Sequence, residues 1–186
     1  MELLIMREAG EEPQRVLEEL RSRVGVDVER FSLRALGSMC PKPPLIAKLA
    51  YLLAMDSNAG DRGVWSSIAE LESDVVESLG ELLSNPSATG AIVSSGTEAN
   101  VIALWAARNL TGKREVVVPA SCHVSFYKAA DLLGLKLIKA PLKRDYTVDV
   151  DFVKRRISRR TAAIVGIAGT TALGAVDPIA ELSELA

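Results

Sequence analysis

Three short polar segments of this chain each follow a run of apolar residues, and they carry residue types that bind small ligands. The first, residues 94–100, places hydroxyls and a glycine at the expected start of a helix. Unpaired N–H groups and the helix dipole favour a negative charge there, Gly96 lets the main chain approach closely, and Ser95 and Thr97 can donate further hydrogen bonds. The segment therefore favours a phosphate, although Ser95 or Thr97 could equally serve only to cap the helix.

The second segment, residues 119–123, contains the only histidine of the chain, His123. An imidazole can stack on a planar cofactor or move protons, although a solitary histidine is also commonly structural. We interpret the neighbouring Cys122 as a small apolar filler rather than a nucleophile, and no Gly-x-Ser-x-Gly elbow supports a catalytic triad. The third segment, residues 168–171, includes Thr170, whose hydroxyl could bind a ring substituent or a substrate carboxylate, or could belong to an ordinary turn.

Short apolar runs and amphipathic patterns alternate around these segments, which predicts an α/β fold with a mostly parallel sheet and right-handed crossovers. Because ligands bind at the carboxyl ends of parallel strands, the three polar segments should meet at one edge of the sheet. The expected strands cover residues 90–93, 115–118, 136–140 and 162–167, and the expected helices cover residues 98–109, 124–133 and 149–159, with a last helix opening at 177–178.

The first part of the chain has a different character, because helical patterns alternate there with polar and proline-containing loops. Helices are expected over residues 11–23, 44–55 and 67–83, the last with a capping box from Ser67 to Glu70. We therefore expect a small helical arm with a substrate-side loop over residues 1–65 and the first part of an α/β domain over residues 66–186.

Composition narrows the classes of function. The 186 residues are 48% apolar and can bury one substantial core, and a formal net charge of −2 gives no electrostatic reason to expect nucleic acid. Two scattered cysteines indicate a reducing compartment, and no zinc-ligand spacing predicts a metal site. The start of the chain supports neither a signal peptide nor a membrane span, so a cytoplasmic protein is expected.

Five motifs in order along the chain resemble the group II decarboxylases that depend on pyridoxal 5'-phosphate (PLP), most closely the archaeal L-tyrosine/L-aspartate decarboxylase branch. The resemblance implies PLP-dependent transferase fold type I, with the large domain incomplete in this chain. Each motif alone is weak, but five in order are specific. They are Ser-Met-Cys-Pro at residues 38–41, Asn-Ala-Gly-Asp at 58–61, Ser-Gly-Thr-Glu-Ala-Asn at 95–100, His-Val-Ser-Phe at 123–126 and Gly-Ile-Ala-Gly-Thr-Thr at 166–171.

The resemblance also assigns roles to the polar segments. It implies that Ser95, Gly96 and Thr97 bind the phosphate of PLP, which agrees with the independent argument for an anion. His123 would stack on the pyridine ring and act in catalysis. Thr170 would contact the cofactor or the substrate near the reacting centre.

The resemblance also implies functional residues outside these three polar segments. The loop at residues 38–41 would approach the substrate across a homodimer interface. The lysine that links to PLP and the aspartate that pairs with the pyridine nitrogen are expected beyond Ala186, in a carboxyl-terminal half. The amino-acid substrate could be aspartate, tyrosine or glutamate. Two alternatives remain open: another fold type I lyase, acting on a phosphorylated or tRNA-linked amino acid, and a non-catalytic half that only associates. Alone, the chain should aggregate or associate through its exposed sheet.

Overall fold

The computed structural model describes residues 10–34 and 42–186, except for the side chains of residues 28–34. The predicted substrate-side loop at residues 38–41 lies outside the described residues. The chain divides into two compact units, residues 1–68 and 69–186, and each is described by itself. The predicted domain boundary after residue 65 stays a prediction.

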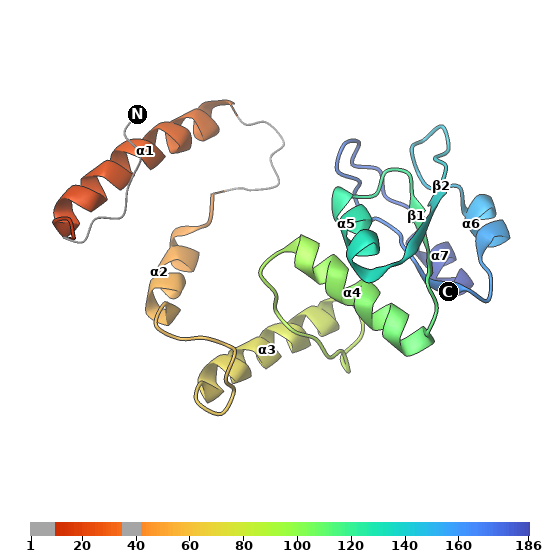
Figure 1. The fold of residues 1–186 in the computed structure, drawn as a ribbon, viewed down its shortest axis with the longest axis horizontal. Helices are drawn as coiled ribbons and strands as arrows, with labels where there is room; N and C mark the ends of the chain where they lie inside the picture. The colour runs from red at the N-terminus through yellow and green to blue at the C-terminus, as the bar shows by residue number, and fades with distance from the viewer. Residues whose placement is uncertain (1–9, 35–41) are drawn as a thin grey trace. The chain divides into compact units, whose positions relative to one another are not determined.

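Two helices lie wholly within the described part of the first unit, α1 (Pro13–Arg34) and α2 (Leu45–Ala54), shown in red and orange in Figure 1. α1 is longer than the predicted 11–23 because it continues through Gly25, a residue that weakens a helix by only about 1 kcal/mol and need not end it. α2 agrees with the predicted 44–55 to within one residue at each end, and none of its residues is buried.

The second unit is built on a three-stranded parallel sheet, so the predicted α/β architecture is confirmed. Its strands are β1 (Glu115–Pro119), β2 (Lys136–Ala140) and β3 (Thr161–Ile164), and β1 lies between the other two. The sheet therefore has β2 and β3 at its edges. The helices are α4 (Gly96–Thr111), α5 (Val124–Leu133), α6 (Val150–Arg156) and α7 (Ile179–Leu185), and α3 (Ser66–Leu82) crosses the division between the units.

Side chains of β1 alternate between two apolar clusters on the two faces of the sheet. Val116 and Val118 pack with residues of α4 and α5, whereas Val117 packs with residues of α6 and α7. Figure 1 shows α4 and α5 on one side of the strands and α6 and α7 on the other. Because every residue of β1 is buried, this strand fixes the loop that follows it, where His123 lies.

The predicted strand at residues 90–93 is wrong, because the structure assigns no strand there. A strand needs a neighbour to accept its ladder hydrogen bonds. The N–H of Ile92 donates instead to Oε1 of Glu72, at 2.9 Å.

Other elements are shorter or begin earlier than predicted. β3 ends at Ile164 rather than residue 167 and is only half-buried, because it pairs with one strand instead of two. α6 is shorter than the predicted 149–159: Asp149 caps it and the backbone turns extended at Ile157. α3 begins at Ser66, so the predicted capping residue Ser67 lies within its first turn. No helix in the described ranges is long and apolar enough to cross a membrane.

Candidate functional site

The first turn of α4 holds the three residues predicted to bind a phosphate. Ser95 is the N-cap, and its Oγ accepts the N–H of Glu98 at 3.3 Å. Within the described ranges, no acceptor is hydrogen-bonded to the N–H groups of Gly96 and Thr97. A Cβ placed on Gly96 would meet nothing within 4 Å in the described part of the chain, so no described atom requires a glycine there. This turn leaves two donors and an open approach for an anion.

Glu98 fixes the entry to this turn, a role that our sequence analysis missed. Its Oε2 accepts hydrogen bonds from the N–H and hydroxyl of Ser94, at 2.8 and 2.5 Å. The bond from the Ser94 hydroxyl, followed by that from its N–H, lowers the pKa of Glu98. The capping-box spacing from Ser95 to Glu98 could have revealed it, although the carboxylate reaches Ser94 instead of the cap residue.

His123 is the N-cap of α5 and is tied to α4 through Ser125. Its Nδ1 accepts the N–H of Ser125 at 3.2 Å and lies 2.9 Å from the Ser125 hydroxyl oxygen. That oxygen accepts a hydrogen bond from Nδ2 of Asn100, one turn into α4, at 2.8 Å. The structure therefore links His123 to the helix that carries the predicted phosphate site. A second hydrogen bond between α4 and α5 joins their carboxyl-terminal ends, where Nη1 of Arg108 donates to the carbonyl of Leu133 at 2.9 Å.

The loop between β1 and α5 contains a buried hydroxyl without a partner. Oγ of Ser121 makes no hydrogen bond within the described part of the chain, although a buried polar atom without one is costly. Cys122 beside it is buried, and that burial raises the pKa of its thiol. The cysteine is therefore held as a thiol, in agreement with a packing role, whereas Ser121 retains unused hydrogen-bonding capacity.

Thr170 lies in the loop after β3, and its own turn uses part of its bonding capacity. Its side chain is buried, its Oγ1 accepts the N–H of Ala175 at 3.1 Å, and its carbonyl accepts the N–H of Gly174. No hydrogen bond joins it to His123 or to α4 among the described residues. Its contact with a cofactor or substrate stays a prediction.

Buried Asp177 holds this loop against the sheet. Oδ1 accepts the N–H of Val148 at 2.8 Å, and Oδ2 accepts the N–H of Ile167 at 2.9 Å. Both oxygens of the carboxylate are therefore engaged by backbone groups far apart in sequence. This residue fixes the loop in which Thr170 lies.

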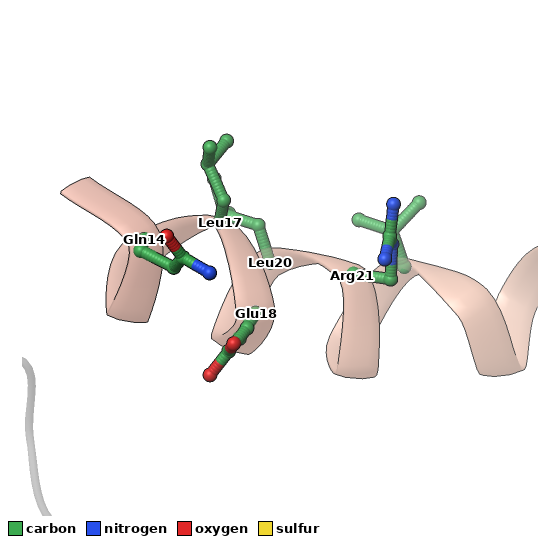
Figure 2. Close-up of a pocket in the computed structure, with 6 residues that line it drawn as sticks. Gln14, Leu17, Glu18, Leu20 and Arg21 are labelled. Atoms are coloured by element: carbon green, nitrogen blue, oxygen red, sulfur yellow. The ribbon is translucent and has the colours of Figure 1, made fainter.

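A surface hollow on α1 contains none of the predicted site residues. Figure 2 shows that one helix supplies its lining, with Glu18 directed away from Leu17. We assign it no function. Its lining residues are Gln14, Leu17, Glu18, Leu20, Arg21 and Val24.

The parallel sheet, with an open helix N-terminus and a capping histidine beyond its strands, is part of the large domain of PLP-dependent fold type I enzymes. Residues 60–186 match the model of the DegT/DnrJ/EryC1/StrS aminotransferase family, and the chain belongs to this family.

Named relatives agree with the resemblance found in the sequence. The chain is 53% identical over 154 residues to the probable L-tyrosine/L-aspartate decarboxylase of Methanothermobacter thermautotrophicus, covering 82% of this chain and 42% of that protein. It is 45% identical over 181 residues to the L-aspartate decarboxylase of Thermococcus kodakarensis, covering 96% and 47%. The chain thus spans less than half the length of these curated relatives.

A solved structure agrees in fold. The sphingosine-1-phosphate lyase of Burkholderia pseudomallei superposes with a TM-score of 0.88 at 31% identity, over 99% of this chain and 46% of that one. The predicted fold class is therefore confirmed.

Proposed function

We propose that this chain is the amino-terminal part of a PLP-dependent amino-acid decarboxylase, which converts L-aspartate or L-tyrosine into the amine and carbon dioxide. The names and identities of the archaeal relatives support this activity. The observation that carries the proposal is the open first turn of α4, where Gly96 leaves space that no atom of residues 10–34 or 42–186 fills.

The residues present fit PLP. The N–H groups of Gly96 and Thr97 and the hydroxyls of Ser95 and Thr97 would bind the phosphate, and Ser95 also caps the turn that presents them. The unpaired hydroxyl of Ser121 offers another donor in the loop that precedes α5. When bound, PLP supplies the stabilisation of negative charge that loss of carbon dioxide requires.

His123 and Thr170 would act on the bound molecules. The ring of His123 would stack on the cofactor and orient it, because Ser125 holds that ring at the start of α5. The hydroxyl of Thr170 still has a proton to donate to the cofactor or substrate, since Oγ1 serves only as an acceptor in its own turn.

We propose that a carboxyl-terminal half provides the lysine that links to PLP, and that the enzyme is a cytoplasmic homodimer of archaeal type. The exposed apolar side chains of α2 support association, since Leu45, Tyr51 and Leu53 are 72, 72 and 89% exposed.

A second candidate is a lyase acting on a phosphorylated amino compound. The likeness to the bacterial sphingosine-1-phosphate lyase favours it, because 31% identity extends over nearly the whole chain. Release of an aldehyde from a phosphorylated amino alcohol, rather than of carbon dioxide from an amino acid, would select this alternative.

The experiment uses the complete enzyme, formed by this chain and its carboxyl-terminal half. We expect a lysine-linked PLP absorbance band and carbon dioxide release from aspartate, tyrosine or glutamate. Gly96→Ala should weaken PLP binding at least about tenfold, because its methyl group would fill the space left for the phosphate.

Gly25→Ala in α1 is the matched control, since a Cβ there also meets nothing within 4 Å. It should leave PLP affinity unchanged. If the wild-type enzyme shows neither the absorbance band nor carbon dioxide release, the proposed function is wrong.

A further inference from the structure

The hydrogen bonds around His123 define which ring nitrogen carries the proton in the neutral imidazole. The backbone N–H of Ser125 points at Nδ1 across 3.2 Å, and a backbone N–H can only donate. Nδ1 must therefore offer its lone pair. In a neutral ring the proton then lies on Nε2.

The donor and acceptor of each hydrogen bond that connects Asn100, Ser125 and His123 can also be assigned. Nδ2 of Asn100 can only donate, so the Ser125 oxygen accepts this bond at 2.8 Å. The hydroxyl proton of Ser125 is then free to point at Nδ1, 2.9 Å away. Ser125 is fully buried, so water does not reach the hydroxyl at the centre of this chain of bonds.

We propose that Ser125 and Asn100 are positioning residues that hold His123 in the Nε2–H tautomer and fix the direction of its ring. The amide donates to the hydroxyl, the hydroxyl donates to Nδ1, and Nε2 on the opposite side of the ring presents its proton as a donor. The use of that donor rests on the proposed function, in which His123 stacks on PLP. The tautomer itself does not depend on that function.

Helix capping alone does not explain these residue types. Serine, threonine, aspartate and asparagine cap helices better than histidine, and asparagine is unfavourable within a helix. The structure nevertheless has histidine at the N-cap of α5 and Asn100 inside α4, joined through Ser125. Both unfavourable choices serve the orientation of one imidazole.

The test is ¹⁵N NMR of the 186-residue chain, labelled at histidine and made without a histidine tag, in solution or as a solid if it associates. Its single histidine gives an unambiguous signal. At a pH where the ring is neutral, we expect the proton on Nε2. Ser125→Ala should lower the ratio of the Nε2–H to the Nδ1–H form about fivefold, the value of one net hydrogen bond.

Asn100→Asp tests the direction of the chain of bonds. An aspartate at this position can only accept, so the Ser125 hydroxyl should turn toward it and the ratio should again fall about fivefold. Asn109→Asp introduces the same charge on the exposed surface of α4 and should leave the ratio unchanged. Circular dichroism confirms that each variant keeps its helices.

A wild-type ring protonated mainly on Nδ1 would overturn the proposal without any variant. A wild-type ratio in both Ser125→Ala and Asn100→Asp would also overturn it. PLP titration of the complete enzyme separates the two proposals. A locked tautomer without PLP binding removes only the proposed function, whereas PLP binding with an unlocked ring removes only this inference.

Discussion

The two ends of β1 use polar residues in opposite ways. At its start, buried Glu115 is surrounded by partners: Arg160 at 2.9 Å, Lys136 at 3.6 Å and the Ser158 hydroxyl at 3.4 Å. Beyond its end, the Ser121 hydroxyl has no partner among the described residues, and Nδ1 of His123 lies 2.9 Å from the Ser125 hydroxyl oxygen. Glu115 is thus held by protein partners, whereas we expect the buried Ser121 hydroxyl to find its partner in a ligand.

Asp177→Ala should cause the largest loss of stability, because it removes a buried carboxylate whose two oxygens both accept backbone hydrogen bonds. The change leaves the N–H groups of buried Val148 and half-buried Ile167 without acceptors, so the free energy of unfolding should fall by about 3 kcal/mol. Urea unfolding followed by circular dichroism measures it.

Asp177→Asn is the control, because it keeps the volume and one acceptor oxygen. It should lose about half as much stability. A loss below about 1 kcal/mol for Asp177→Ala would show that these two bonds do not hold the loop that contains Thr170.

Glu115→Gln should change how stability depends on pH. Burial works to raise the pKa of Glu115, but the hydrogen bond and charge of Arg160 and the charge of Lys136 outweigh it, so the pKa is lowered. A lowered folded-state pKa stabilises the fold above the unfolded pKa, and that stability is lost as the pH falls through the folded value. Wild type and variant should therefore differ most at neutral pH and converge in acid.

Lys136→Met is the control at this end of the strand. The lysine side chain is 71% exposed, so its removal should cost about 0.5 kcal/mol or less. Parallel stability curves for wild type and Glu115→Gln from neutral to acid pH would contradict the assignment of Glu115 as a stabilising carboxylate.

Ser121→Ala should have the smallest effect on stability and a clear effect on binding. Removing a buried hydroxyl without a partner should leave the free energy of unfolding unchanged or raise it by up to about 1 kcal/mol. PLP affinity of the complete enzyme should fall. If the variant instead loses more than about 1 kcal/mol, the hydroxyl has a structural partner and the comparison between the two ends fails.

Local signals in the sequence predicted the elements around the site best. α5 and β2 have the predicted bounds because Gly134, at φ 61°, closes the helix just before the strand begins. The strand at residues 90–93 was predicted wrongly, since pairing depends on a neighbour that local sequence does not reveal.

The sequence predicted the positions of some candidate site residues in the fold for the same reason, while their roles stay predictions. Gly96 and His123 follow from their positions after β-like runs and before helices, which the sequence shows directly. The hydrogen bond from Asn100 to Ser125 joins residues that are 25 apart in the sequence, so no local pattern predicts it. The sequence shows that Ser121 carries a hydroxyl, but only packing shows that this hydroxyl is buried and has no partner among the residues the structure describes.

The two hydrogen bonds between α4 and α5 also have a mechanical consequence. Asn100 joins the beginnings of the helices and Arg108 joins their far ends, so neither helix can rotate or slide without breaking a bond at one end. α4 and α5 should therefore move as one rigid unit, and slow local unfolding should open both helices together. An anion bound at the first turn of α4 would then slow the exchange of amide hydrogens in α5 as well.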